Sequence, residues 1–201
     1  MNLPNKLTLS RIFLTLIFMI FIMPLPDWIV NSSYLSFMHS QLEGINKFIM
    51  GTGKYIAAGI FIVAASTDGV DGYIARKRKQ ITQFGKFIDP IADKLLVTAA
   101  LIALVQRGEL TGWAAMFIIA REFIVTGLRL IAAGEGIVIA ASNWGKIKTI
   151  TQMVAIVASL LPLTWVTSIH FDRYSMLLAV IVTIYSGYDY IVKNIKLIDY
   201  R

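Results

Sequence analysis

The sequence has 201 residues, and its shares of 57% hydrophobic and 15% charged residues lie outside the range of an ordinary soluble domain. Cysteine is absent, which excludes disulfides, thiolate metal sites and a cysteine nucleophile. The net charge of +7 would suggest nucleic-acid binding in a soluble protein, but in so apolar a chain it is typical of basic loops beside anionic lipid headgroups. We therefore predict one integral membrane domain over residues 1–201, with no nucleic acid as partner.

Six apolar runs bounded by polar or basic residues predict six transmembrane helices. The short segment before the first run is predicted to lie at the membrane interface. Between the first two runs, five apolar residues recur at helical spacing and predict a further interfacial helix. The runs cover about 9 to 29, 54 to 75, 87 to 105, 112 to 132, 149 to 167 and 174 to 192, and the five residues are Tyr34, Met38, Leu42, Ile45 and Ile49. The predicted fold class is an all-α polytopic membrane protein.

Basic residues are divided unevenly between the two ends of the predicted spans. The N-terminal segment, the loop around 76–79, the loop before the fifth span and the C-terminal tail are rich in Lys and Arg, whereas the opposite ends are poor in them. Because cytoplasmic loops retain basic residues, both termini and the loop around 76–79 should be cytoplasmic. The sequence thus predicts a multi-pass protein of the cell membrane.

Four aspartates stand at the facing ends of the second and third predicted spans. Asp68 and Asp71 are three residues apart and Asp89 and Asp93 are four apart, so each pair shares one helix face. The short loop makes the two helices antiparallel, and the pairs should meet at similar depth. Such carboxylates repel one another unless cations neutralise them, and oxygen ligands suit Mg²⁺ or Mn²⁺. Two such ions could clamp an in-line phosphoryl transfer.

Simpler interpretations stay open for the residues beside these acids. Gly69 and Gly72 leave space for a phosphate, although glycines in a span also serve helix packing. Arg76 could hold a phosphate or act as a cytoplasmic anchor. The acids themselves could be paired with Lys94 or Arg121, but four carboxylates exceed what those two partners need.

The stretch "DGVDGYIARKRKQITQFGKFIDPIAD" resembles the signature of the CDP-alcohol phosphotransferase family, D-x-x-D-G-x-x-A-R-x8-G-x3-D-x3-D. Every fixed position of the signature is present in this one stretch, which makes the resemblance highly specific. These positions are Asp68, Asp71, Gly72, Ala75, Arg76, Gly85, Asp89 and Asp93. Six spans and a cytoplasmic signature also fit the family, so the resemblance covers essentially the whole chain.

The resemblance implies transfer of a substituted phosphate from a CDP-linked donor to an alcohol, with release of CMP. Asp68, Asp71 and Asp89 would ligate one divalent cation, Mg²⁺ or Mn²⁺. Asp93 would complete a second metal site and would also be the catalytic base that deprotonates the acceptor hydroxyl. The implied site therefore holds two ions and works on the cytoplasmic side.

The resemblance also assigns residues to the nucleotide donor. Gly72 and Arg76 would meet the cytidine diphosphate part, Gly72 by close approach and Arg76 by charge. Asn5, Thr8 and Arg11 resemble a polar N-terminal element of the family, in which Asn5 and Thr8 are expected beside the donor and Arg11 beside the acceptor phosphate. An interfacial anchor and helix start is the alternative for these three.

The acceptor alcohol must be sought outside the signature. Arg121, Glu122 and Arg129 lie in the fourth predicted span, and Lys146 and Lys148 precede the fifth. The four cations are expected to bind the phosphate of an acceptor, although Arg121 and Glu122 could be only a structural pair. "REFIVTGLR" is similar to the segment found in bacterial family members that use sn-glycerol 3-phosphate.

We therefore expect CDP-diacylglycerol as donor and sn-glycerol 3-phosphate as acceptor, in phospholipid biosynthesis. Membrane lipids are expected to surround the protein. Serine, phosphatidylglycerol or inositol phosphate are the alternative acceptors. Two other classes of protein are the alternatives to this family. An ion-coupled transporter would place its acids near the membrane midplane in two half-repeats, and an aspartate-rich prenyltransferase would repeat its acid cluster in two loops. The family resemblance further implies a homodimer.

Overall fold

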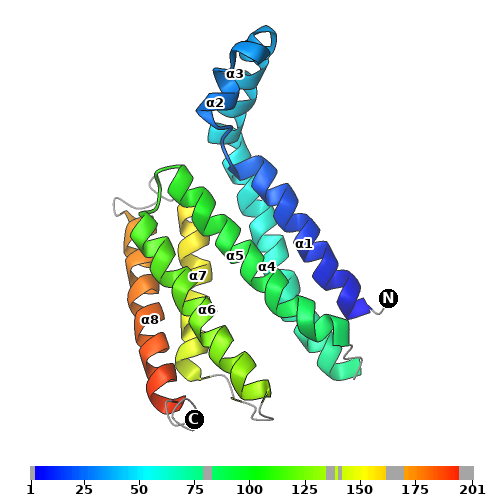
Figure 1. The fold of residues 1–201 in the computed structure, drawn as a ribbon, viewed down its shortest axis with the longest axis vertical. Coiled ribbons are helices and arrows are strands. Elements are labelled where there is room, and N and C mark those ends of the chain that lie inside the picture. Colours follow the sequence, from blue (N-terminus) through cyan, green and yellow to red (C-terminus); the bar gives the residue numbers. More distant parts are fainter. Residues whose placement is uncertain (1–2, 79–82, 135–138, 140–141, 162–169, 195–201) are drawn as a thin grey trace. The chain divides into compact units, whose positions relative to one another are not determined.

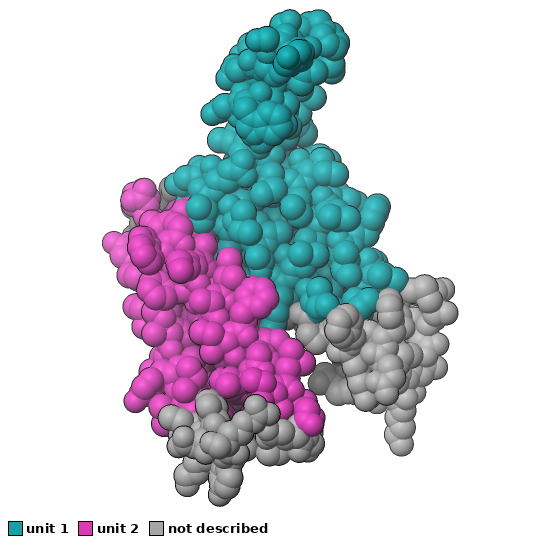
Figure 2. Space-filling model, viewed as in Figure 1, with its two compact units in different colours: residues 1–109 teal, residues 110–201 magenta. Residues whose placement is uncertain are grey.

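The computed structural model describes residues 3–78, 83–134, 139, 142–161 and 170–194. Within the helices, the side chains of 3–7, 68–78, 83–87, 89, 90 and 93 lie outside this description. Every regular element among the described residues is a helix (Figure 1), so the all-α prediction is confirmed. The chain divides into two compact units, residues 1–109 and 110–201 (Figure 2), and each is described by itself.

Three long helices build the first unit: α1 Leu3–Ile22, α4 Lys54–Arg78 and α5 Gln83–Gln106. Helix α1 packs against both α4 and α5, and the rings of Phe18 and Phe61 meet at 5.9 Å between centroids. Alanines fill much of the remaining core, at positions 57, 58, 64, 92, 99, 100 and 103. Small side chains let helices approach closely, which is how helices associate where water provides no driving force.

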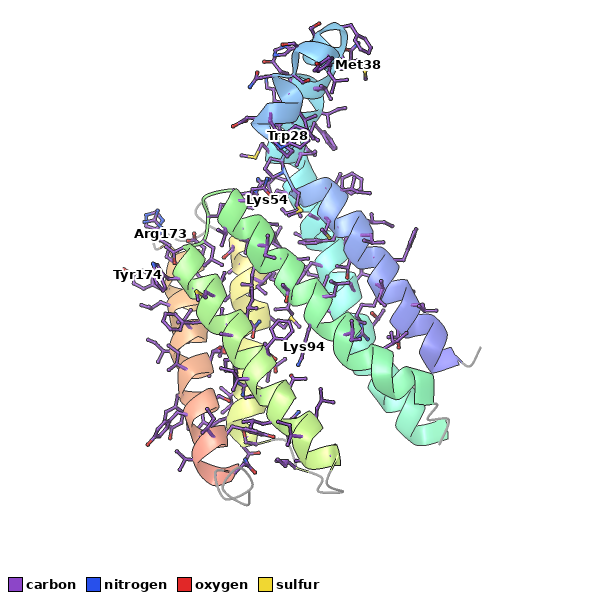
Figure 3. All side chains as sticks on the ribbon, viewed as in Figure 1. Trp28, Met38, Lys54, Lys94, Arg173 and Tyr174 are labelled. Atoms are coloured by element: carbon purple, nitrogen blue, oxygen red, sulfur yellow. The ribbon has the colours of Figure 1, made fainter. Side chains whose placement is uncertain are left out.

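The helices α1 and α4 are joined by a helical hairpin that extends beyond the three long helices of this unit (Figure 1). It comprises α2 Asp27–Val30, the 3₁₀ segment η1 Ser33–Met38, α3 His39–Phe48 and a π-helical turn, η2 Ile49–Gly53, that leads directly into α4. Trp28 and Met38 lie on this hairpin (Figure 3). The predicted extra helix is therefore present in part, as α3, because Tyr34 and Met38 lie in the 3₁₀ segment and Ile49 in the π-helical turn. Its position at the membrane interface stays a prediction.

One arginine holds the hairpin end of the first unit together. Arg107 follows α5 and donates from Nη1 to the carbonyl oxygens of Ile22 and Ile49, both at 3.3 Å, and from Nη2 to that of Met50 at 2.9 Å. Its Nε donates to Glu109 at 3.1 Å. The end of α5 therefore lies beside the end of α1 and the turn that precedes α4. Helices α1 and α5 run in the same direction, and α4 runs against them.

The second unit contains α6 Gly112–Gly134, α7 Asn143–Leu160 and α8 Phe171–Asn194. Helix α8 packs against both α6 and α7. The start of α7 is capped by Ser142, whose hydroxyl accepts from the Gly145 N–H at 3.0 Å. Trp144 at this start meets Tyr185 of α8 edge-on at 4.6 Å, and the two helices run antiparallel (Figure 1).

Each of the six predicted spans falls on a long helix, although the bounds of two were wrong. The fifth run was expected over 149 to 167, but α7 spans Asn143–Leu160. The first run was expected to reach residue 29, but α1 ends at Ile22 because Pro24 and Pro26 follow and disfavour a continued helix. Among the described residues, two helical stretches are long and apolar enough by themselves to cross a membrane, Ser33–Thr67 and Phe171–Asn194. Six crossings and a single domain stay predictions.

Candidate active site

The signature lies at the end of the first unit that is remote from Arg107. Asp68, Asp71, Gly72 and Arg76 belong to the last turns of α4, and Asp89 and Asp93 to the first turns of α5. The side chains of all six, and that of Asn5 on α1, lie outside the described part of the structure. Their backbones are placed, and α4 contacts α5 within the unit. The helices thus determine the level of each residue along the bundle.

The Arg107 contacts give the three helices a common reference level, because they join the end of α1, the end of α5 and the carbonyl of Met50. Asn5 precedes the end of α1, Asp89 precedes Arg107 and Asp68 follows Met50, each by about five turns of helix. At about 1.5 Å rise per residue, all three positions are roughly 25 to 27 Å from the reference level. One residue from each helix therefore occupies the same level.

The remaining acids lie within about one turn of that level. Asp93 is about four turns before Arg107, or roughly 21 Å, and Asp71 is about six turns after Met50, or roughly 31 Å. All four aspartates thus fall within roughly 10 Å along the bundle. This spread agrees with the expectation of similar depth, while the meeting of their side chains stays a prediction.

Thr8 and Arg11 on α1 are buried at this end of the unit. Thr8 is about four turns before the end of α1, at the same distance as Asp93 from Arg107, and Arg11 is almost one turn nearer the reference level. Each residue is only 2% exposed. An interfacial anchor would keep its polar groups accessible, so the burial does not fit that alternative. The roles expected for Thr8 and Arg11 at the site stay predictions.

The second unit brings together three of the predicted cationic residues and one acid. Arg121 and Glu122 come from α6 and Lys148 from α7, where it is buried. Lys148 Nζ pairs with Glu122 Oε1, and Arg121 Nη1 lies 3.6 Å from the same oxygen. Arg129 lies about two turns after Arg121 on α6. Arg121, Arg129 and Lys148 therefore lie in or beside one cluster.

Lys146 is the exception among the acceptor residues of this unit. It lies two residues before Lys148, which places it on nearly the opposite face of α7, and it is exposed. The pairing of Lys148 with Glu122 was likewise not expected, since the sequence suggested Arg121 as the partner of that acid. Periodicity would have separated Lys146 from Lys148, because only one of two residues two positions apart can face the core of a helix bundle.

Two polar residues of α8 complete the cluster, and the sequence interpretation missed both. Arg121 Nη2 donates to Ser186 Oγ at 2.7 Å. Arg129 Nε donates to the Tyr190 hydroxyl at 3.3 Å, and its guanidinium carbon lies 5.6 Å from the centroid of that ring. Ser186 and Tyr190 are four residues apart and therefore share one face of α8. Two polar residues four positions apart in an apolar helix were the available signal, although it does not say which helix they face.

Comparison with known proteins agrees with the signature. The sequence model of the family described as CDP-alcohol phosphatidyltransferase matches residues 1–185. The chain is 46% identical over 196 residues to the CDP-diacylglycerol–glycerol-3-phosphate 3-phosphatidyltransferase of Bacillus subtilis, covering 96% of this chain and 95% of the relative. Proteins of the same name from Rickettsia felis and Mycoplasma pneumoniae are 32% and 36% identical, over 94% and 79% of this chain and 93% and 67% of theirs. This chain belongs to the CDP-alcohol phosphatidyltransferase family.

Proposed function

We propose that this protein transfers the phosphatidyl group of CDP-diacylglycerol to sn-glycerol 3-phosphate, giving phosphatidylglycerol phosphate and CMP. The observation that carries the proposal is the 46% identity, over almost the whole of both chains, to a relative named for this reaction. The complete signature on α4 and α5 supports the CDP-linked donor. The cluster of Arg121, Arg129 and Lys148 supports an acceptor that carries a phosphate.

The donor set of the signature fits hard divalent cations, because four carboxylates lie on two contacting helices within about two turns. Asp68, Asp71, Asp89 and Asp93 would hold two such ions, Mg²⁺ or Mn²⁺. When bound, they supply positive charge that stabilises the phosphate oxygens during the displacement. Asp93 is the residue proposed to hold the proton of the acceptor hydroxyl.

In the proposed reaction, the 1-hydroxyl oxygen of glycerol 3-phosphate attacks the phosphorus that bears the diacylglycerol. A new P–O bond forms, the bond from this phosphorus to the CMP oxygen breaks, and the hydroxyl proton passes to the Asp93 carboxylate. Arg76 and Gly72 contact the diphosphate of the donor, with Asn5 and Thr8 of α1 beside it. Arg121 and Arg129 fix the acceptor phosphate, and the assignment of Arg11 to that phosphate stays a prediction from the sequence.

The acceptor assignment is tested by release of CMP from CDP-diacylglycerol with a panel of alcohols. Glycerol 3-phosphate should be preferred by at least about tenfold in kcat/KM over serine, phosphatidylglycerol and inositol phosphate, a difference of about 1.4 kcal/mol in transition-state stabilisation. A preference for any of the other three would replace the assignment. The reaction should also require Mg²⁺ or Mn²⁺ and stop on addition of EDTA.

The role of Asp93 is tested by Asp93→Asn, which keeps the size of the side chain and removes its basicity. We expect CMP release to fall at least about a hundredfold, because general-base assistance contributes about 10² to 10⁴ in rate. Binding of glycerol 3-phosphate and the thermal transition should change little. Activity near that of the wild type would show that another group accepts the proton.

The proposed location is the cell membrane, with six crossings, a homodimeric assembly and both termini and the signature facing the cytoplasm. The distribution of Lys and Arg supports this orientation. Because the chain has no cysteine, single cysteines introduced at Lys77 and at Ser40 can be labelled in intact cells without background. Ser40 should react with a membrane-impermeant maleimide and Lys77 should not; the reverse pattern would invert the topology.

A further inference from the structure

The two arginines of α6 are drawn together by α8. Arg121 and Arg129 are eight residues apart on α6, which separates their backbones by about 12 Å along the helix. Their hydrogen-bond partners Ser186 and Tyr190 are only four residues apart on α8, or about 6 Å. The backbone positions that anchor the two guanidinium groups on α8 are thus closer together than the positions that carry them on α6.

Gly187 gives Arg121 the space to lie across α8. A Cβ atom at this position would stand 3.0 Å from Arg121 Cγ, closer than side-chain carbons normally approach. Any larger residue would push the stem of the arginine away from Ser186. The three residues Ser186, Gly187 and Tyr190, called here the α8 seat, thus determine where both arginines end.

The arginines carry more positive charge than the surrounding described residues neutralise. Glu122 is shared between Lys148 and Arg121. Asp189, the acid next to the α8 seat, is paired with Lys193 at 2.7 Å. Within the described part of this cluster, three cations thus face one acid. The buried Nε of Arg121 also has no hydrogen-bond acceptor among the described residues, so a donor remains available in a place where burial makes an unmade bond costly.

We propose that the α8 seat is the element that makes the enzyme select an acceptor carrying a phosphate monoester. Ser186, Gly187 and Tyr190 are positioning residues: they anchor both guanidinium groups on one face of α8, where a dianionic phosphate is to bridge them. The dianion relieves the repulsion between the arginines. It also accepts hydrogen bonds from N–H groups, such as the Arg121 Nε, that have no acceptor among the described residues. This inference rests on the proposed function and assigns its acceptor specificity to α8.

The test uses three variants of the full-length protein in detergent or nanodiscs: Ser186→Ala, Gly187→Ala and Tyr190→Phe. Each should raise the KM for glycerol 3-phosphate, by about tenfold for the first two and about threefold for Tyr190→Phe, which keeps the ring under Arg129. The KM for CDP-diacylglycerol and kcat should stay within about twofold. Ser186→Thr retains a hydroxyl and should recover most of the loss. Gly127→Ala is the matched control, because a Cβ there meets no atom within 4 Å.

Direct binding separates this inference from the function on which it rests. Calorimetric titration with glycerol 3-phosphate, without the nucleotide donor, should show binding to the wild type and at least about tenfold weaker binding to Gly187→Ala, with uncharged glycerol bound by neither. Wild-type protein that prefers another acceptor in the CMP assay overturns the proposed function. The role of the α8 seat is overturned if the wild type uses glycerol 3-phosphate and the variants bind it equally well. It is also overturned if the variants raise the KM for glycerol 3-phosphate and the KM for CDP-diacylglycerol alike. Absence of binding to the wild type also overturns that role.

Discussion

Removal of Arg107 should destabilise the first unit without touching its chemistry. The side chain is only 2% exposed and donates to the carbonyl oxygens of Ile22, Ile49 and Met50 and to Glu109. In Arg107→Ala these acceptors lose their donor at once. The bonds to Ile22 and Ile49 are partly buried, whereas the carbonyl of Met50 is exposed and can turn to water.

The magnitude follows from the two partly buried carbonyls. Leaving a fully buried acceptor unsatisfied costs about 1 to 3 kcal/mol, so two would cost roughly 2 to 6 kcal/mol. Because both bonds are only partly buried, we expect a loss in the lower half of this range, about 3 kcal/mol. Glu109 keeps Lys54 at 2.7 Å and is not left as an unpaired charge. For a chain of this length, a loss of about 3 kcal/mol lowers Tm by about 6 to 12 °C.

The assay is thermal unfolding of purified protein in detergent, followed by circular dichroism. Arg107→Lys should fall between the wild type and Arg107→Ala, because one ammonium group cannot reach three carbonyls. Arg173→Ala, at the exposed start of α8 (Figure 3), is the control and should change Tm by less than about 2 °C. CMP release well below the transition should persist, since the signature lies roughly 25 Å away along the bundle. A Tm for Arg107→Ala within about 2 °C of the wild type would refute the reasoning.

Two further predictions concern packing and the buried ion pair. Gly53→Ala should lower Tm by about 5 °C or more, because its Cβ would stand 2.6 Å from the carbonyl oxygen of Phe21. Gly51→Ala is the control and should be neutral or slightly stabilising, because a Cβ there meets no atom within 4 Å. Equal Tm values for the two variants would contradict the close packing of α1 on η2. Lys148→Met should destabilise more than the double variant Glu122→Gln/Lys148→Met in the same unfolding assay, because the single change leaves a partly buried carboxylate without its lysine. If the losses of stability in Lys148→Met and in Glu122→Gln add up to the loss in the double variant, the pair does not interact.

Much of the helical architecture could be predicted from the sequence, because a membrane span needs a long apolar run and each such run can be recognised from its own residues alone. The exceptions have local causes that are also visible: Pro24 and Pro26 end α1 early, and Lys146 and Lys148 fall on different faces of α7. The four aspartates were found because motif spacing is a property of the sequence itself.

Contacts between distant helices could not be predicted in this way. Ser186 and Tyr190 lie far along the sequence from Arg121 and Arg129, and no periodicity in either helix indicates which face of α8 meets α6. The burial of Arg11 has the same origin, since it depends on how α1 packs against α4 and α5. Packing between helices decides which polar residues of a span face a neighbouring helix, and this packing is seen only in the folded structure.

The two units carry opposite kinds of unbalanced charge. The first places four carboxylates within about two turns of two contacting helices, and the second, in its described part, gathers three cations around a single acid. Like charges that lie close together oppose folding unless something neutralises them. The proposed function supplies such partners, divalent cations for the aspartates and the acceptor phosphate for the arginines. In the proposed function, binding of these cations and of the substrate phosphate would stabilise both clusters and orient the groups that react.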